Sequence, residues 1–307
     1  MARYITSRIL WLIPVLFFVS LVTFTLMHAV EGGPWDQERK LPDSVTAVLD
    51  KEYGLDKPVW RQYVDFLYNA VRGDLGVSFM RQNRPVTSIL LDGFKTSALL
   101  GGISLALVCF VGVTLGVVAA VNRNGPLDYF SVFFASMGSA VPGFILGILL
   151  MYVLSVKLHL LPTFGWGTWQ QAIMPTLTLA ALPTAFLARV TRSSMLEVLS
   201  QDYIRTAHAK GLSSFTVLNR HALRNALIPI VTVIGPIAAR LVTGSFIVEQ
   251  MFSIPGIGRL FVQSVNARDY GLIMGTTLFF ALVVAAANLA VDIAYAVVDP
   301  KIRFAKG

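Results

Sequence analysis

The chain contains 307 residues, of which 55% are hydrophobic and only 14% are charged, and its mean hydropathy is +0.67. Soluble domains carry about 25% charged residues, so this composition excludes a soluble globular protein and indicates an integral membrane protein. The net charge of +8 would suit a nucleic-acid-binding protein, but the cytoplasmic loops of membrane proteins are also basic, and the sequence has no nucleic-acid-binding motif. Cys109 is the only cysteine, which excludes an internal disulfide and a metal site built from cysteines.

The first apolar stretch predicts a retained membrane span rather than a signal peptide. Arg3 and Arg8 precede an apolar run that extends to Met27. This run is longer than the apolar core of a signal peptide, and no convincing small-residue cleavage site follows it.

Six apolar stretches are long enough to cross a bilayer. They cover residues 9–30, 97–121, 129–156, 171–193, 226–249 and 272–298. Basic residues gather in alternate loops, whereas the short loops on the other side hold only Lys157, Arg259 and Arg268. Because lysine and arginine are enriched on the cytoplasmic side, this pattern predicts an all-α polytopic protein with both termini in the cytoplasm.

Segment 31–95 lies outside the cytoplasm and predicts a small ordered insertion of helices. One helix is expected to begin at Asp43 and end near Gly54, and a second to begin at Pro58 and stop at Gly73. The insertion would serve either as a structural cap on the bundle or as a contact for a partner. The chain then divides into a first span at 1–30, the insertion at 31–95, a five-helix core at 96–299 and a tail at 300–307.

Small residues and prolines mark the interior of the spans. Gly112-x-x-x-Gly116 and Gly143-x-x-x-Gly147 place glycines one turn apart, which predicts close helix packing. Prolines are expected to interrupt the third, fourth and fifth spans at Pro142, Pro175, Pro183, Pro229 and Pro236. Such breaks are tolerated where neighbours or a cavity satisfy the freed backbone groups, and they fit a transporter that moves between states.

The loop at 194–225, expected in the cytoplasm, is polar and basic. Its sequence predicts two helices separated by a break. A helix is expected from Tyr203 to Lys210, with Gly211 as a left-handed residue at its end. Ser213 or Ser214 can cap a second helix. That second helix carries Phe215, Leu218, Ala222 and Leu223 near one face and offers Arg220 and Arg224 to lipid headgroups. A short helix with small residues, held between two spans, suits docking into a groove on a soluble partner.

This loop resembles the EAA loop of bacterial ABC importer permeases, through Thr206-Ala207, three further residues and Gly211. The segments Asp202-Tyr-Ile-Arg-Thr-Ala-His-Ala-Lys-Gly-Leu and Arg220-His-Ala-Leu-Arg-Asn-Ala-Leu-Ile-Pro are similar to the oligopeptide and dipeptide branch of that family. Arg205 replaces the glutamate of the general motif and Arg224 aligns with its proline, and both departures fit the peptide branch. The resemblance extends over essentially the whole chain, including the turn at Pro255-Gly-Ile-Gly258 and Arg268-Asp-Tyr270.

The resemblance implies the type I ABC importer permease fold in a bacterial inner membrane, working by alternating access. It implies a heterodimer with a second, related permease, two cytoplasmic ATPase subunits and an extracytoplasmic peptide-binding protein. ATP and magnesium would be bound by the ATPase subunits, and this chain would carry no cofactor, metal or catalytic residue. The residues that would couple the chain to the ATPase are Arg205, Thr206, Ala207, Lys210, Gly211 and Leu212.

The sequence lacks the common nucleotide-binding and catalytic motifs. A transport subunit of this kind would take its energy from a partner protein or an ion gradient. The chain has no Gly-x-x-x-x-Gly-Lys-Ser/Thr loop for ATP phosphates, no His-Glu-x-x-His zinc motif and no Gly-x-Ser-x-Gly elbow. An ion-coupled transporter would typically place carboxylates at the membrane midplane, and no acidic residue is convincingly central. A membrane enzyme would need a nucleophile, a base and an orienting group close together, and the sequence shows no such group. A channel is the remaining alternative.

Arg240 and Glu249 are the candidates for a substrate pathway, because ionisable residues inside spans are costly unless paired or hydrated. Arg240 lies about twelve residues past the start of the fifth span, which at about 1.5 Å per residue is roughly 18 Å and close to the middle of the membrane. Glu249 lies near the outer end of the same span. Arg240 could attract a peptide carboxylate, or form an ion pair that only orients the bundle. Relatives of this branch are associated with dipeptides, oligopeptides, glutathione, nickel complexes and murein peptides, and the segment 31–60 favours oligopeptides.

Overall fold

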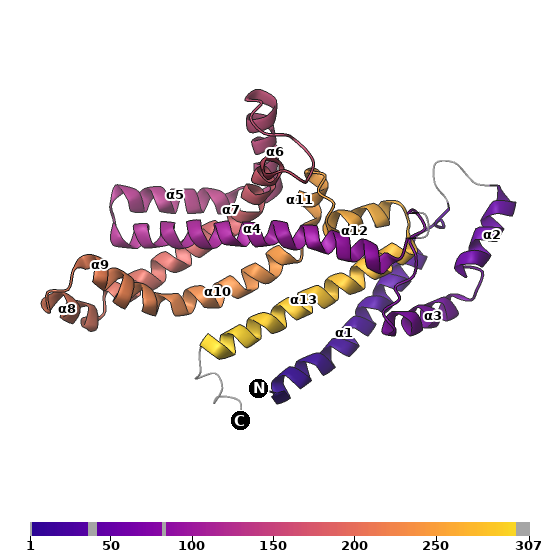
Figure 1. Cartoon of the computed structure of the whole chain (residues 1–307), viewed down its shortest axis with the longest axis horizontal. Coiled ribbons are helices and arrows are strands. Elements are labelled where there is room, and N and C mark those ends of the chain that lie inside the picture. Colours follow the sequence, from indigo (N-terminus) through magenta and orange to yellow (C-terminus); the bar gives the residue numbers. More distant parts are fainter. Residues whose placement is uncertain (1, 36–41, 82–83, 299–307) are drawn as a thin grey trace. The chain divides into compact units, whose positions relative to one another are not determined.

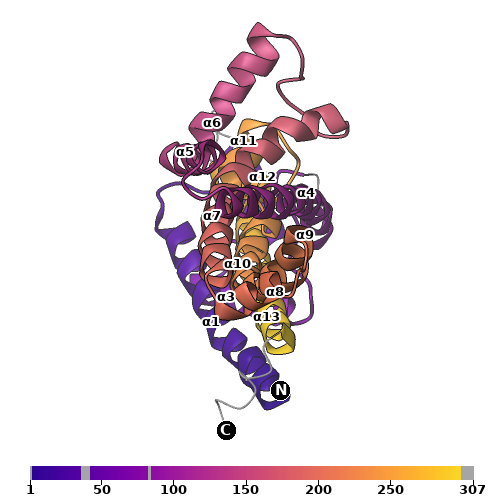
Figure 2. The same cartoon turned by 90° about the vertical axis from the view of Figure 1, so that its left-hand side faces the viewer.

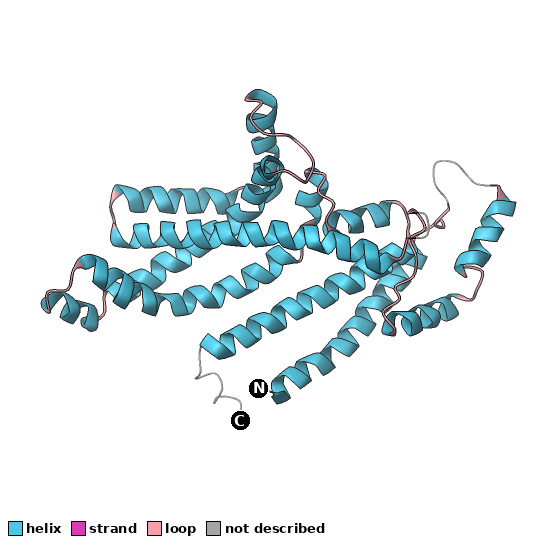
Figure 3. Ribbon diagram, viewed as in Figure 1, coloured by secondary structure: helices cyan, strands magenta, loops and turns pink. Residues whose placement is uncertain are grey.

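The computed structural model describes residues 2–35, 42–81 and 84–298. The tail expected at 300–307 and part of the segment 31–60 lie outside these ranges. Within them the regular structure is helical (Figure 3), apart from an isolated bridge between Val77 and Pro85. The expected all-α fold is confirmed.

The helices follow the predicted spans and insertion in order (Figure 1). They are α1 (Ala2–Ala29), α2 (Asp43–Tyr53), α3 (Val59–Val71), α4 (Val86–Val121), α5 (Pro126–Ala140), α6 (Gly143–Leu150), the π-helical η1 (Met151–Lys157), α7 (Trp169–Leu199), α8 (Asp202–Ala209), α9 (Ser214–Thr216), the π-helical η2 (Val217–Leu223), α10 (Arg224–Val242), α11 (Phe246–Met251), α12 (Ile257–Asn266) and α13 (Tyr270–Val298). The chain forms two compact units, the first from 1–97 and 254–286 and the second from 98–253 and 287–307.

Five described helices are long and apolar enough to cross a membrane, or six if the bent pair at 126–138 and 143–157 forms one span. The second predicted span begins earlier than expected, because α4 starts at Val86 rather than at 97. The third is not one straight helix, since its two halves meet at an angle of 101°. Pro142 explains the bend: it keeps Val141 extended, with φ −94° and ψ 121°, and α5 ends there.

The other predicted interruptions are wrong. Pro175 and Pro183 lie inside the continuous helix α7, and Pro229 and Pro236 lie inside α10. A proline removes one helical hydrogen bond. Breaking a membrane helix would leave several more backbone groups unpaired, so the helix continues through each proline.

The first unit contains the insertion, whose two helices end as predicted, although α3 begins at Val59, one residue after the predicted Pro58. α2 ends at Gly54 with φ +69°, and α3 follows Pro58 and is closed by Gly73 with φ +83°. Lys57 reaches across to Asp65 on α3, with 2.7 Å between Nζ and Oδ2, and this contact holds the pKa of Asp65 below its usual value. Tyr63 ties α3 to α1 through its hydroxyl, 2.9 Å from Ser20 Oγ.

Asp269 is the central polar residue of this first unit and is fully buried. Its Oδ1 accepts the backbone N–H of Leu272 at 3.0 Å and so caps α13. Its Oδ2 accepts from Ser78 Oγ at 2.5 Å and from the Met80 N–H at 3.3 Å. The segment before α4 is therefore fixed to the start of α13 by one carboxylate.

The second unit is organised around α7, which packs against α5, α6 and α10. α5 and α10 both lie along α7 (Figure 1), and Figure 2 gives a second view of the same three helices. The predicted close approach at Gly112 and Gly116 is confirmed, because a methyl group at Gly116 would lie 2.6 Å from the Ala188 carbonyl oxygen on α7. In the other pair only Gly147 is crowded, whereas a methyl group at Gly143 would meet its nearest atom at 3.7 Å.

Candidate functional site

The helix of the loop at 194–225 is α8, and it ends as predicted. Gly211 has φ +78°, and its N–H donates to the His208 carbonyl at 2.9 Å. The next N–H, from Leu212, donates to the Ala207 carbonyl at 3.3 Å. This pair of bonds is the Schellman arrangement, which closes a helix with a left-handed residue. The chain direction after α8 is therefore set by Gly211.

The predicted second helix begins at the expected serine but follows a different course. The Ser213 hydroxyl accepts the N–H of Thr216 at 3.4 Å and caps α9. The chain then passes through the π-helical turns of η2 into α10. The wider π turn shifts the buried positions, which fall at Val217, Ala222 and Ala226.

The sequence placed Phe215 near one helix face with Leu218, Ala222 and Leu223, but the side chain of Phe215 is 77% exposed whereas Ala222 is fully buried. The sequence argument assumed an ordinary helix of 3.6 residues per turn from Ser214 onward. A five-residue step from Val217 to Ala222 replaces the usual three or four. Phe215 is consequently left outside the packing.

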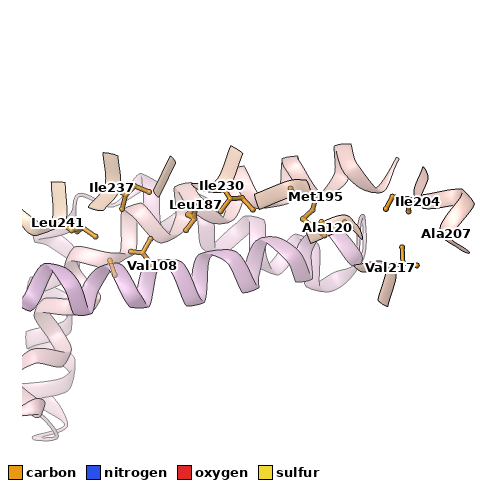
Figure 4. Packing of buried hydrophobic residues seen from close by; sticks show 13 residues of the cluster. Val108, Ala120, Leu187, Met195, Ile204, Ala207, Val217, Ile230, Ile237 and Leu241 are labelled. Carbon is orange, nitrogen blue, oxygen red and sulfur yellow. The ribbon is translucent and has the colours of Figure 1, made fainter. Parts of the chain in front are cut away.

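One side of α8 is buried in the chain's own core. Ile204 and Ala207 belong to a hydrophobic cluster that also contains Val217 of η2 and Met195 of α7 (Figure 4). The Tyr203 hydroxyl accepts from the Asn225 side chain at 3.0 Å, which joins the start of α8 to α10. α8 is therefore attached to both long helices that it connects.

The other side of α8 and the turn after it are exposed. Of the six residues predicted for coupling, five lie there: Arg205, Thr206, Lys210, Gly211 and Leu212. Ala207 differs, because it is only 6% exposed and packs inside the cluster. Its small size serves packing within this chain. Ala209 is the exposed alanine of the same helix.

Two apolar side chains are exposed beside this polar helix. Leu212 is 38% and Phe215 is 77% exposed, among serine, threonine and asparagine neighbours. Two exposed apolar side chains this close together in the sequence, on a polar loop, form a candidate contact surface for another protein. Grouping residues by helical spacing did not single out Phe215 as an exposed side chain, although Phe215 lies between the polar residues Ser214 and Thr216.

A partly buried ion pair joins the start of α5 to α7. Arg192 on α7 donates from Nε to Asp128 Oδ1 at 2.6 Å and from Nη2 to Oδ2 at 2.7 Å. Asp128 lies in the first turn of α5, is 3% exposed, and also accepts the N–H of Asn124 at 2.9 Å. Two parallel bonds of this kind fix both distance and orientation. No sequence pattern predicts this pair, since its members are 64 residues apart.

The two pathway candidates occupy different surroundings. Arg240 lies in the last turn of α10 and its side chain is exposed. Glu249 lies on α11 and is fully buried, and its Oε1 accepts the N–H of Ser245 at the start of the same helix, 3.3 Å away. The carboxylate of Glu249 therefore helps to cap its own helix. Within the described residues, no group of three or more His, Cys, Asp or Glu side chains could hold a metal ion.

Most of the sequence matches two family descriptions. Residues 112–304 match the binding-protein-dependent transport system inner membrane component, and residues 1–101 match the N-terminal part of such a membrane component.

Curated relatives match over their full length. The chain is 42% identical over 306 residues to the dipeptide transport system permease protein DppB of Bacillus subtilis, covering 100% of this chain and 99% of the relative. It is 38% identical to the oligopeptide transport system permease protein OppB of Haemophilus influenzae, covering 99% and 100%. It is 42% identical to the glutathione transport system permease protein GsiC of Escherichia coli K12, again covering 99% and 100%.

Solved structures share the fold at low sequence identity. An inward-facing form of the MetNI methionine ABC transporter aligns with a TM-score of 0.56 at 18% identity, covering 69% of this chain and 96% of that one. An amino acid ABC transporter aligns with a TM-score of 0.55 at 13% identity, covering 68% and 94%. With a family match over most of its length and full-length relatives near 40% identity, the chain belongs to the binding-protein-dependent transport system inner membrane components, as a multi-pass permease subunit of a bacterial ABC importer.

Proposed function

We propose that this permease carries peptides into the cell by alternating access. In the proposed assembly it pairs with a second, related permease, receives substrate from an extracytoplasmic binding protein and docks two cytoplasmic ATPase subunits. ATP and magnesium are bound by the ATPase subunits, and this chain supplies the path and the coupling helix. Both of its termini lie in the cytoplasm.

The observation that carries this proposal is the two-sided construction of α8. Ile204 and Ala207 are buried against the chain's own helices, while Thr206, Ala209 and Lys210 are exposed. A helix that is packed on one side and exposed on the other can be displaced by a partner bound to its exposed side without separating from the membrane domain. The cap at Gly211 and the bond between Tyr203 and Asn225 hold it in one orientation.

Movement of α8 would reach the membrane helices through packed contacts. α8 follows α7 after a two-residue turn and packs against η2, which continues into α10. Close-packed protein interiors have low compressibility and therefore transmit displacement. In the proposed mechanism, the ATPase subunits close when they bind ATP, and this closure displaces α8. The displacement of α8 rearranges α7 and α10 and opens the substrate path outward.

The substrate class is proposed from the relatives. Two of those compared are named for dipeptides and oligopeptides, and a third for glutathione, which is itself a small peptide. We propose dipeptides or oligopeptides as the substrate, with glutathione as the second candidate at the same 42% identity as the dipeptide relative.

The partners are tested by purifying the tagged chain from detergent-solubilised membranes and identifying the accompanying proteins by mass spectrometry. We expect a second six-span permease, an ATPase with a P-loop and an extracytoplasmic binding protein. Recovery of the chain alone as a stable homo-oligomer would contradict the proposal and favour an ion-coupled transporter or a channel.

The substrate is tested with the same preparation, by screening the co-purified binding protein against dipeptides, longer peptides and glutathione in a thermal-shift assay. Binding of free peptides and their ATP-driven uptake into proteoliposomes would support the proposal. Binding and uptake of glutathione alone would select the second candidate.

A further inference from the structure

The membrane helix α10 exposes a polar face over most of its length. The structure describes α10 in full, and from Pro229 to its end the exposed residues are Pro229, Thr232, Pro236 and Arg240, here called the polar stripe. Steps of three and four residues place all of them on one side of the helix. In this part of α10 no large apolar side chain is exposed. The side of α10 that its own chain leaves uncovered is therefore polar.

The two prolines of the polar stripe add hydrogen-bond acceptors to it. Proline has no N–H, so it cannot donate to the carbonyl four residues before it. Pro229 therefore deprives the Asn225 carbonyl of its helical donor, and Pro236 does the same to the Thr232 carbonyl. In a membrane, such groups are satisfied by neighbouring helices or by water in a cavity. The Thr232 hydroxyl donates to the Ile228 carbonyl at 2.9 Å and keeps its lone pairs for an outside donor.

Arg240 is the charged member of the polar stripe. It lies about 24 Å along the helix axis from Arg224, at about 1.5 Å per residue, inside the apolar span from Ser214 to Met251. Among the described residues, no acidic side chain pairs with Arg240. An arginine within a span is costly unless it is paired or faces water. Arg240 therefore requires either water or a partner outside this chain.

The helix α5 shows a contrasting exposed face. Phe130, Phe133 and Phe134 are between 45% and 61% exposed, and each presents an apolar ring. Side chains of this kind suit a surface that meets lipid, because lipid chains are as apolar as leucine. A hydroxyl, a guanidinium and two carbonyls without their helical donors do not suit it. The polar stripe is therefore unsuited to lipid and suited to water or polar groups.

Close packing fixes the rotation of α10 that presents this face. Ile230 points away from the polar stripe, into the hydrophobic cluster shared with α7 (Figure 4). A methyl group at Gly235 would lie 2.4 Å from Val291 Cγ1 on α13. A methyl group at Gly101 of α4 would lie 2.2 Å from the Leu241 carbonyl oxygen. Because α7, α13 and α4 hold α10 on its other sides, the polar stripe stays on the open side.

We propose that the polar stripe lines the substrate path and that Arg240 binds the carboxylate of the passing peptide, an inference that rests on the proposed function. Arginine matches a carboxylate with two parallel N–H donors. Thr232 lies about 12 Å from Arg240 along the axis, at about 1.5 Å per residue, and offers acceptors to the N–H groups of the peptide. An extended chain covers about 3.3–3.6 Å per residue, so a peptide of about three residues reaches from Arg240 to Thr232.

The first test asks whether water reaches the polar stripe in the complete transporter, reconstituted in proteoliposomes with its ATPase subunits and binding protein. Cys109→Ala removes the only cysteine of this chain. In that background, Thr232→Cys places one thiol on the polar stripe, and the matched control Phe133→Cys places one on the apolar face of α5. A membrane-impermeant thiol reagent is present inside and outside the vesicles, with and without ATP. Because the reactive thiolate forms where water reaches, we expect labelling of Thr232→Cys and none of Phe133→Cys.

The second test compares ATP-driven uptake of a tripeptide with uptake of its C-terminal amide, using a peptide that the binding protein accepts in both forms. Because hydrogen bonds to charged groups are the strong ones, we expect Arg240→Gln to lower uptake of the free acid about tenfold and to leave uptake of the amide unchanged. Arg240→Lys keeps the charge without the paired donors and should give an intermediate loss. Arg61→Gln, at an exposed arginine of α3, is the control and should keep the wild-type ratio of acid to amide uptake.

Two results would overturn this inference. Absence of labelling at Thr232→Cys, both with and without ATP, would assign the polar stripe to a dry contact with the second permease. A ratio of acid to amide uptake that stays at the wild-type value in Arg240→Gln would show that Arg240 does not bind the carboxylate. A transporter that is labelled at Thr232→Cys but takes up no peptide, even as wild type, would instead contradict the proposed function and leave the polar stripe as the path of another solute.

Discussion

Ala207 and Ala209 are two residues apart on α8, yet their surroundings are opposite. Ala207 is 6% exposed within the hydrophobic cluster, whereas Ala209 is exposed. The sequence suggested that both the size of Ala207 and the size of Gly211 serve docking. The structure separates two roles for small residues in this helix, one in packing within the chain and one at its surface.

The two alanines provide a matched pair of substitutions. Ala207→Leu should destabilise the permease by about 1–3 kcal/mol, because extra methyl groups are forced into a packed core. Ala209→Leu should change stability by less than about 0.5 kcal/mol, because the site is exposed, and it should lower transport per ATP hydrolysed. Thermal unfolding of the purified complex and a coupled transport assay give the two readouts. Equal stability of both variants would contradict the assigned faces.

Gly211 has a conformational role that can be separated from a steric one. A methyl group there would meet no atom within 4 Å, but φ is +78°. Gly211→Ala should therefore cost about 1 kcal/mol through the backbone alone, and Gly211→Asn should cost less, because asparagine tolerates this conformation. We expect the asparagine variant to transport better than the alanine variant. The reverse order would show that docking requires the smallest side chain at this position.

At the scale of elements, the joint between α5 and α7 depends on Asp128 and Arg192. Asp128→Ala should cost about 3 kcal/mol, near the low end for a broken buried pair, because Arg192 is 28% exposed and partly hydrated. Asp202→Ala is the control, since Asp202 pairs with Arg205 at 3.5 Å with 95% of its side chain exposed, and it should cost less than about 1 kcal/mol. Thermal unfolding of the single and double variants measures the coupling. Additive effects of Asp128→Ala and Arg192→Ala would mean that the two residues do not interact.

Helix ends were predictable from sequence where the signal is local. Gly54, Gly73 and Gly211 close their helices and Ser213 caps α9, because a cap involves only residues a few positions apart. Four of the five proline breaks were not predictable, since the cost of a proline competes with the cost of unpaired backbone in a membrane helix. Pro142 differs, because α5 ends directly before it at an extended Val141.

At the scale of the whole molecule, composition and charge pattern were enough to identify a helical membrane protein, and the motif in the loop was enough to identify its family. The contacts that set the geometry were not predictable. Asp269 meets Ser78 across 191 positions, and Asp128 meets Arg192 across 64. Such pairs are fixed by folding, and no periodicity in a single sequence marks them.

The central claim, that α8 docks on the ATPase, is tested most directly by site-specific photo-crosslinking in intact membranes. A photoreactive amino acid replaces Ala209, which is exposed on α8, or Arg61, which is exposed on α3 of the insertion. We expect position 209 to form an adduct with the ATPase subunit, identified by mass spectrometry, and position 61 to form none with it. An adduct with the ATPase at position 61, or none at position 209 in an assembled transporter, would contradict both the coupling role of α8 and the orientation of the chain in the membrane.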